Sequence, residues 1–221
     1  MRALLLYSVF ILLFLSCRKD EYENNYTPIG REYSNLDLNS HFIYNVTEVV
    51  YDDFTNSIDT SEYQIKEYNE STFKDNLGRD AVRIDRYKRN NDTADWIYEN
   101  TWYAVNDVQK YERVENNIRY LKLSFPITID AVWNSNSLNM ENVNTVYYGM
   151  MHRPYTLDTF SFDSVVSVET NPIINGFRER AYKEIYAKNI GLIYKNYVYI
   201  DKAGLLQKGI RRTYKLIEYG K

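Results

Sequence analysis

Short runs in which apolar and polar residues alternate recur along this chain, and they constrain its fold more than any other feature. In the first run, Phe42, Tyr44, Val46 and Val50 share one parity, and the polar residues Asn45 and Thr47 lie between them. The same alternation recurs in residues 81–87, 121–125 and 162–168, and two further strand-like runs lie at residues 190–200 and 211–219. A period of two places successive side chains on opposite faces of a β-strand. The sequence therefore predicts a succession of half-buried strands.

Clusters of turn-forming residues separate these runs. They lie at residues 56–57, 76–78, 90–92, 116–117, 171–172 and 201–204. Their spacing suits successive antiparallel hairpins and not βαβ units. The expected fold class is mainly β: an antiparallel meander that forms a strongly curved sheet or a barrel-like (lipocalin-like) domain, with little helix. Closure would protect the edge strands, but an open curved sheet fits the same pattern. The best helical window is residues 137–143, one or two turns long.

Composition agrees with this fold and limits the class of partner. Tyrosine occurs 23 times among 221 residues, against 8 glycines and 4 prolines. Tyrosine is enriched in strands, where its ring packs and its hydroxyl stays hydrated, and exposed rings could stack on sugars. The 27 basic and 30 acidic residues are well mixed and leave a net charge of −3. A nucleic-acid binder would show a basic patch or stripe, so no nucleic-acid partner is expected.

The N-terminus has the features of a lipoprotein signal peptide. Met1-Arg2 is followed by an apolar run that ends near Leu15, which is too short to span about 30 Å of hydrocarbon. The sequence Phe14-Leu15-Ser16-Cys17 resembles the lipobox that lipoprotein signal peptidase cleaves, with Phe14 in place of the usual aliphatic residue. Residues 1–16 are therefore expected to be removed and Cys17 to carry the lipid. An ordinary secretory signal with an incidental cysteine is the alternative.

The segment after Cys17 predicts where the domain is displayed. Cys17 is the only cysteine, so no intramolecular disulfide can form. Lys19, Asp20 and Glu21 resemble the export signal that sends lipoproteins to the cell surface in Bacteroidetes. We expect an outer-membrane lipoprotein, with the cell surface favoured over the periplasmic face. Residues 17–40 are expected to form a lipidated flexible tether, and residues 41–221 a single β-rich domain.

The C-terminal part of the chain resembles a known group of proteins. Residues 184–195 read EIYAKNIGLIYK, with Phe125-Pro126 and Trp133 upstream. This arrangement resembles a group of uncharacterised lipoproteins found in Bacteroidetes, and the resemblance covers most of residues 40–219 in the order of its elements. Its motifs are structural, so the resemblance implies a fold and a location in the cell envelope, but it implies no activity.

Three positions carry structural expectations. Pro126 lacks a backbone N–H and should mark the end of a strand. Gly191 should lie at a bulge or at a close approach between two strands. Trp133, which precedes Asn134-Ser135-Asn136, is expected to cap the core, although a functional loop pinned by this ring is the alternative.

The sequence offers little catalytic chemistry. His41 and His152 are the only histidines, and neither accompanies a G-x-S-x-G elbow. Both are expected to have structural or solvent-facing roles. A hydrolase based on two carboxylates needs no histidine, but no particular Asp or Glu stands out. We therefore predict that the protein is not an enzyme and has no catalytic residue.

Metal and cofactor sites are not expected either. Two histidines and no free thiol make a zinc site improbable. Asp53, Thr55, Ser57 and Asp59 alternate as calcium ligands would, but they lack the glycine and glutamate of a helix–loop–helix site. A polar hairpin turn is the better interpretation of these four residues.

Two three-residue segments match an O-glycosylation motif of exported Bacteroidetes proteins. Asp92-Thr93-Ala94 lies in an asparagine-rich turn, so Thr93 is a candidate modification site. Asp163-Ser164-Val165 lies inside an expected strand and is interpreted as coincidence.

Two non-enzymatic functions remain open, with a carboxylate-dependent hydrolase third. A binding module for a glycan, lipid or peptide predicts a concave apolar pocket with a few polar groups, and a fully packed sheet interior would contradict that form. A structural or assembly accessory of a surface or outer-membrane complex predicts an exposed apolar patch. The expected partners are the membrane, through the lipid anchor, and a glycan, lipid or envelope protein. The sequence identifies no ligand-binding residue.

Overall fold

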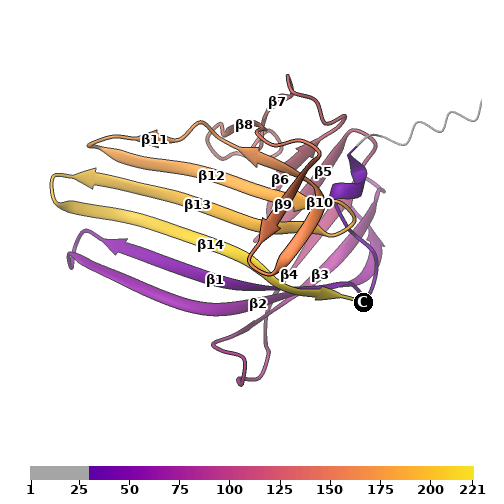
Figure 1. The fold of residues 1–221 in the computed structure, drawn as a ribbon, viewed down its shortest axis with the longest axis horizontal. Coiled ribbons are helices and arrows are strands. Elements are labelled where there is room, and N and C mark those ends of the chain that lie inside the picture. The colour runs from indigo at the N-terminus through magenta and orange to yellow at the C-terminus, as the bar shows by residue number, and fades with distance from the viewer. Residues whose placement is uncertain (1–29) are drawn as a thin grey trace, which may run out of the picture.

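The computed structural model describes residues 30–221, which form one curved antiparallel sheet of fourteen strands (Figure 1). A short 3-10 helix, η2 (Arg31–Tyr33), precedes the strands. The N-terminal six are β1 (His41–Asp52), β2 (Ser57–Lys74), β3 (Asp80–Arg89), β4 (Ile97–Asn106), β5 (Lys110–Glu115) and β6 (Ile118–Ser124). The C-terminal eight are β7 (Val132–Asn134), β8 (Thr145–Tyr148), β9 (Arg153–Leu157), β10 (Phe160–Glu169), β11 (Ile173–Ile174), β12 (Arg178–Ala187), β13 (Gly191–Ala203) and β14 (Leu206–Gly220).

The strands follow one another as a meander that returns on itself. Their order in the sheet is β6-β5-β4-β3-β2-β1-β14-β13-β12-β10-β8-β7, while β9 pairs with β10 and β11 with β12. The pairing of β1 with β14, from His41 opposite Gly220 to Tyr51 opposite Gly209, joins the two halves of the chain. The predicted mainly β, antiparallel meander is therefore confirmed. Among residues 30–221, no helix is long and apolar enough to cross a bilayer.

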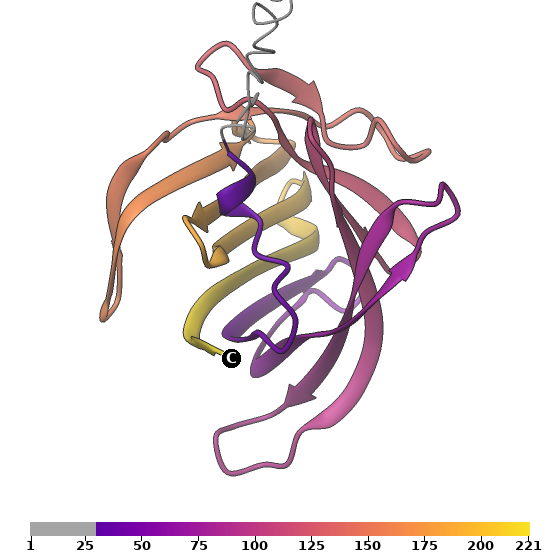
Figure 2. The ribbon, with the colours of Figure 1, turned by 90° about the vertical axis from the view of Figure 1, so that its right-hand side faces the viewer.

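The two edges of the sheet meet, so the sheet is nearly closed into a barrel. The backbone N–H of Leu121 in β6 donates to the carbonyl of Ser135, just after β7, at 2.9 Å. The Trp133 indole N–H donates to the Leu121 carbonyl at 3.1 Å. Tyr148 also bridges the seam, because its hydroxyl donates to the Ser124 carbonyl at 2.7 Å and accepts from the Ser124 N–H at 3.0 Å. Viewed end-on, the sheet curves around the core of the molecule (Figure 2).

Asparagine and glycine close the hairpins where the sequence predicts turns. Asn116 and Asn117 form the two-residue loop between β5 and β6 with φ of 51° and 66°, as a type I′ turn requires. Asn56 also has a positive φ, in the turn between β1 and β2. Gly191 has a φ of 100° and begins β13 opposite Ala187, whereas the register shift in the pairing with β12 falls at Ile193, so the bulge expected at Gly191 lies two residues further along. Pro126 follows the end of β6, as predicted.

The helical turn predicted for residues 137–143 is wrong. This segment is a series of turns, with the backbone N–H of Ser137 bonded to the Asn134 carbonyl and that of Asn139 to the Asn136 carbonyl. The Asn134 side chain accepts backbone N–H bonds from Asn136 and Asn144. Side chains that bond neighbouring backbone groups compete with the helical ladder, so the asparagines hold a loop here.

Residues 30–40 lie across one end of the barrel (Figure 2). Tyr33 is fully buried, and its hydroxyl is 2.7 Å from both the His152 imidazole and the Ser164 hydroxyl. The Asn189 N–H, in the turn between β12 and β13, donates to the Glu32 carbonyl at 2.6 Å. This part of the expected tether is therefore packed onto the domain, and residues 17–29 lie outside the described residues.

Two apolar clusters make up the core. One includes Tyr33, Tyr111, Trp133 and Tyr186 and lies beneath the covered end and the seam. The other joins the β9–β10 hairpin to β1, β12, β13 and β14 through residues that include Phe42, Val46, Leu157, Phe162, Ile185, Ile193 and Leu216. Trp133 is 9% exposed, so the prediction that it caps the core is confirmed.

Candidate functional site

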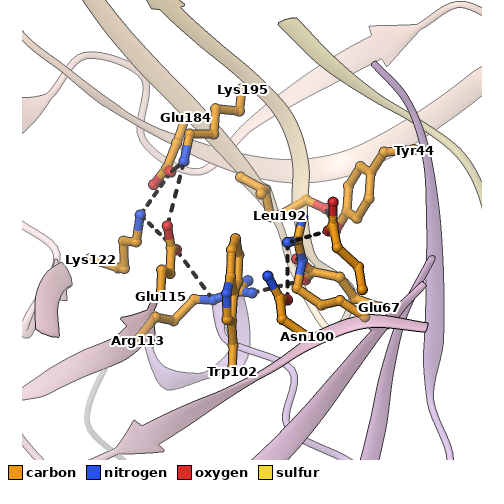
Figure 3. Close-up of polar contacts among 12 residues, drawn as sticks. Tyr44, Glu67, Asn100, Trp102, Arg113, Glu115, Lys122, Glu184, Leu192 and Lys195 are labelled. Atoms are coloured by element: carbon orange, nitrogen blue, oxygen red, sulfur yellow. Dashed lines mark hydrogen bonds and ion pairs between the residues drawn. The ribbon is translucent and has the colours of Figure 1, made fainter. Parts of the chain in front are cut away.

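The interior of the barrel holds a charged network as well as apolar side chains (Figure 3). Glu67 on β2 accepts hydrogen bonds from Arg86 on β3 at 3.3 Å and from Arg113 on β5 at 2.9 Å. The guanidinium carbon of Arg86 lies 3.6 Å from the centre of the Trp102 ring. Arg86 lies directly opposite Glu67 on the neighbouring strand, whereas Arg113 reaches Glu67 across the interior from β5, which is not adjacent to β2.

A second group of ion pairs continues the network. Lys122 lies 3.0 Å from Glu115 and 3.1 Å from Glu184, and Lys195 lies 3.2 Å from Glu184. Arg113 links the two groups, since its Nε is 3.5 Å from Glu115. The negative and positive charges of the network are equal in number. Its carboxylates are Glu67, Glu99, Glu115 and Glu184, and its cations are Arg86, Arg113, Lys122 and Lys195.

The lysines keep the buried carboxylates of this network ionised. Burial alone would raise the pKa of Glu184, but Lys122 and Lys195 outweigh it and hold that pKa at about 2. The pKa of Glu115 is also lowered, against its own burial, by Lys122, Lys195 and Arg113. Charges paired in this way give a defined core, and removing one partner would leave the others buried and uncompensated.

The packed interior leaves little room for a ligand. A cavity of about 20 Å³ lies where Tyr44, Glu67, Tyr111 and Arg113 meet residues 33–36. A space of this size holds about one water molecule. The concave apolar pocket expected of a binding module is therefore not found at this place in the barrel.

A larger concave surface lies on the outer face of the barrel, over the strands that follow residues 30–40. This outer groove has a volume of about 480 Å³ and is lined by His41, Ile43, Lys66, Tyr68, Tyr87, Trp96 and Glu218. Sites for small ligands commonly have volumes of about 300–1,000 Å³. The outer groove is therefore the candidate functional site.

Strand register brings the lining of the outer groove together. Lys66 on β2 lies opposite Ile43 on β1 and Tyr87 on β3. Ile43 in turn lies opposite Glu218 on β14. Since Glu67 faces the interior, its neighbour Lys66 faces outward, as alternation along a strand requires. Ile43 is buried at 6% exposure, so it forms an apolar floor between polar groups.

Trp96 reaches the outer groove from the connection between β3 and β4. The Gln64 side chain holds this connection against β2 by donating to Asp92 at 2.7 Å, and Arg89, at the end of β3, donates to Gln64 at 2.7 Å and to Asp92 at 3.2 Å. The Arg89 guanidinium carbon lies 4.3 Å from the Trp96 ring centre, and the Lys66 amine lies 4.9 Å from it. Contacts between cations and aromatic rings of this kind fix the orientation of the indole.

The charges at the outer groove are close to balance. The Lys66 amine also lies 4.8 Å from the centre of the Tyr87 ring. Burial lowers the pKa of Lys66 and nearby Arg89 lowers it further, whereas Glu218 raises it. The His41 imidazole is 3.2 Å from a Glu218 carboxylate oxygen. The groove thus offers aromatic rings, an apolar floor and polar groups of both signs.

The structure places the sequence-predicted residues in different settings. His41, expected to be structural, lines the outer groove, whereas His152 contacts Tyr33 at the covered end. Thr93 is exposed, and its hydroxyl donates to the Asn91 side chain at 2.8 Å. Ser164 bonds Tyr33 and holds the covered end. Cys17, Lys19, Asp20 and Glu21 lie outside the described residues.

The alternating oxygen ligands at residues 53–59 belong to a hairpin turn. Asp52 accepts the backbone N–H groups of Phe54 and Thr55, and the Ser57 hydroxyl donates to Asp59 at 3.2 Å. Within residues 30–221, no group of three or more His, Cys, Asp or Glu side chains is arranged to hold a metal ion.

Of the seven residues that line the groove, sequence reasoning singled out only His41; it missed Ile43, Lys66, Tyr68, Tyr87, Trp96 and Glu218. Tyr87 lies in a predicted strand, but Lys66 lies in a polar stretch that shows no clear alternation. A single sequence gives no signal that Trp96, in a turn, folds back over β2. The long-range pairing of β1 with β2 and β14 assembles the groove.

No protein-family description and no curated protein matches this chain. Two solved structures are similar to it at low identity. An inferred lipoprotein from Parabacteroides distasonis ATCC 8503 shares 10% identity, with a TM-score of 0.49 over 85% of this chain and 98% of that one. An inferred exported protein with a YmcC-like fold from Bacteroides fragilis NCTC 9343 shares 9% identity, with a TM-score of 0.45 over 84% of this chain and 97% of that one.

Proposed function

We propose that this protein is a non-enzymatic envelope lipoprotein, anchored through Cys17, whose outer groove binds a neutral carbohydrate. The observation that carries the proposal is the groove itself, where Tyr68, Tyr87 and Trp96 lie around an apolar floor with charged groups among them. Its volume of about 480 Å³ lies within the usual range for small-ligand sites.

Carbohydrate matches this lining because sugar rings are amphipathic. Their C–H faces pack on aromatic rings, and their hydroxyl groups both donate and accept hydrogen bonds. Lys66 supplies donors and Glu218 supplies acceptors on opposite sides of the floor. A lipid chain would leave these charged groups desolvated without partners, at considerable cost.

The balance of charge favours a neutral sugar over an acidic one. Lys66 and Glu218 carry opposite charges, and His41 is already close to Glu218. An acidic ligand would be attracted by Lys66 and repelled by Glu218. Selection would therefore depend on ring stacking and hydrogen bonding and not on net charge.

The lowered pKa values of the buried carboxylates support a non-enzymatic role. A glycosidase needs one carboxylic acid with a raised pKa to protonate the leaving group. Glu115 and Glu184 both contact Lys122. Both have lowered pKa values, so this pair suits a structural role and not acid catalysis.

The cellular location in this proposal is inferred from the N-terminal sequence. The lipobox-like Phe14-Leu15-Ser16-Cys17 supplies an anchor, and Lys19, Asp20 and Glu21 favour the outer face of the outer membrane. A sugar-binding groove on an anchored domain would hold glycan at the cell surface.

Isothermal titration calorimetry of the purified lipoprotein in detergent, with neutral di- and trisaccharides of glucose, galactose, mannose and N-acetylglucosamine as probes, tests the proposal. At least one series should bind, and Trp96→Ala should weaken its binding by tenfold or more. Tyr199→Ala is the matched control, because Tyr199 is 47% exposed but lies outside the groove lining. No binding across the panel, or equal loss in the two variants, would contradict carbohydrate binding in this groove.

A further inference from the structure

Large apolar side chains protrude from three hairpin tips at one end of the molecule. Phe54, between β1 and β2, is 95% exposed, and Leu205, between β13 and β14, is also 95% exposed. Phe177, at the turn that leads into β12, is 77% exposed. Ile58, Ile174 and Leu206 flank them at 61%, 70% and 42% exposure. Exposed apolar residues gathered in this way mark an interaction surface.

The three tips lie side by side. The β13–β14 hairpin pairs with β12 on one side and with β1 on the other, so its tip lies between the other two. The Lys202 N–H donates to the Phe177 carbonyl at 2.7 Å, which ties two tips directly. In Figure 1 all three tips are at the left, at the end of the long strands opposite η2.

Charges next to the tips are mostly paired with one another. Lys208 lies 3.6 Å from Asp53, and Lys202 lies 3.4 Å from Glu179. Arg180 pairs with Asp201 at 2.5 Å. The tips thus combine apolar apexes with a nearly neutral belt of ion pairs just behind them. This order of groups matches the boundary of a bilayer, where apolar side chains enter and charges remain among the headgroups.

The length of the N-terminal segment allows the tips to reach the membrane that the lipid would occupy. From residue 17 to residue 30 the chain advances thirteen positions. Thirteen residues span at most about 45 Å. The 15 residues of β14 measure about 50 Å. Gly30 lies at the end opposite the tips, so this segment is too short for the barrel to stand upright on its tips; the lipid anchor and the tips reach one bilayer when the barrel is tilted toward its surface.

We infer that the Phe54, Phe177 and Leu205 tips insert into the headgroup region of a phospholipid bilayer as a second contact beside the lipid anchor. Three neighbouring apexes, each on its own turn, suit a fluid phase, which adapts to each of them. A protein partner or a second copy of the chain would instead need a matching surface with three hollows. This inference does not depend on the ligand of the outer groove.

Depth-dependent fluorescence quenching on the purified lipoprotein tests this contact. Leu205→Cys is labelled with an environment-sensitive fluorophore, and the protein is reconstituted in vesicles of phosphatidylethanolamine and phosphatidylglycerol with nitroxide-labelled lipid. The comparison is Leu77→Cys, since Leu77 is 74% exposed on the β2–β3 turn at the end near η2. We expect at least twofold quenching and a blue shift at position 205, and little change at position 77.

A second set of variants guards against insertion driven by the probe. Phe54→Ser and Phe177→Ser, added to the labelled Leu205→Cys protein, should reduce the quenching by at least half.

Labelling of the wild-type protein would show that Cys17 is free, and would count against the anchor separately from the tips. Quenching at position 77 alone, at both positions equally or at neither would overturn the inference. Crosslinking of position 205 to an envelope protein without lipid quenching would assign the tips to a protein partner.

Discussion

The interior network and the outer groove use the same chemistry on opposite faces of neighbouring strands. Inside, Arg86 lies 3.6 Å from the centre of the Trp102 ring and bonds Glu67. Outside, Arg89, three residues further along the chain, lies 4.3 Å from the centre of the Trp96 ring. In each case a guanidinium on or at the end of β3 covers an indole from the following segment.

The two regions differ in what surrounds these contacts. Around Arg86 the carboxylates and cations balance in a space where the neighbouring cavity is only about 20 Å³. Around Trp96 the groove has about 480 Å³ open to solvent. Fully paired charges in a packed space stabilise one structure, whereas similar groups beside open volume are free to contact a ligand. This difference suits a stabilising role for the interior and the binding role proposed for the groove.

Removing Glu184 should have the largest effect on this comparison. Glu184 is 1% exposed and pairs with Lys122 and Lys195. Glu184→Ala would leave two ammonium groups without this partner, and the free energy of unfolding should fall by about 3–5 kcal/mol. Chemical denaturation measures the change. The exposed Glu62 is the control, and Glu62→Ala should change stability by less than about 0.5 kcal/mol. Equal effects at the two sites would show that the network is not stabilising.

Acid should weaken the interior through the same carboxylate. Lys122 and Lys195 hold the folded-state pKa of Glu184 at about 2, below the usual value near 4.5. The stability from Glu184 is therefore complete above about pH 4.5 and is lost as the pH falls towards about 2. Each such carboxylate adds a slope of up to about 1.4 kcal/mol per pH unit in that window. Urea denaturation between pH 2 and 6 should show a shallower slope for Glu184→Gln than for the wild-type protein, and parallel slopes would contradict this.

Strand alternation and turn residues predicted much of the fold. Asn116-Asn117 and residues 76–78 mark turns that the structure contains, and residues 81–87 and 211–219 lie in β3 and β14. β2 was missed because its inward positions include Glu67 and Asn69, which break the apolar periodicity. A buried charge is recognisable only once its partner strands are known, and those partners are distant in the sequence.

The candidate site was largely beyond prediction for a related reason. His41 is named in the sequence analysis, but only with a structural or solvent-facing role. The outer groove depends on Lys66 lying opposite Ile43 and Tyr87, which is a matter of register, and on the bend that returns Trp96 to β2. Local propensity predicts that a strand or turn exists, but it does not predict which outward faces become neighbours.

Trp96→Ala should separate binding from stability. The indole is partly exposed and is fixed by Lys66 and Arg89, so its loss removes a stacking surface without opening the core. Carbohydrate affinity should fall by tenfold or more, while the free energy of unfolding changes by no more than about 1 kcal/mol. Trp102→Ala is the counterpart, since Trp102 contacts Arg86 and Arg113 inside the barrel. Its main effect should be on unfolding. A reversal of these two results would exchange the roles of the two regions.

The smallest expected effect concerns the charge of Lys66. Lys66→Met keeps an unbranched apolar chain beside Tyr87 and Trp96 but removes the ammonium group. If the ligand is a neutral sugar, the variant loses one hydrogen-bond donor and affinity should fall by about fivefold, the equivalent of about 1 kcal/mol. If the ligand is acidic, a charge-assisted bond is lost as well, and the fall should exceed about tenfold and lessen as salt is raised. Calorimetry at low and high salt distinguishes the two cases, because a hydrogen bond to a neutral hydroxyl is little screened. A large, salt-sensitive loss would thus retain the groove as the binding site while replacing the class of sugar assigned to it.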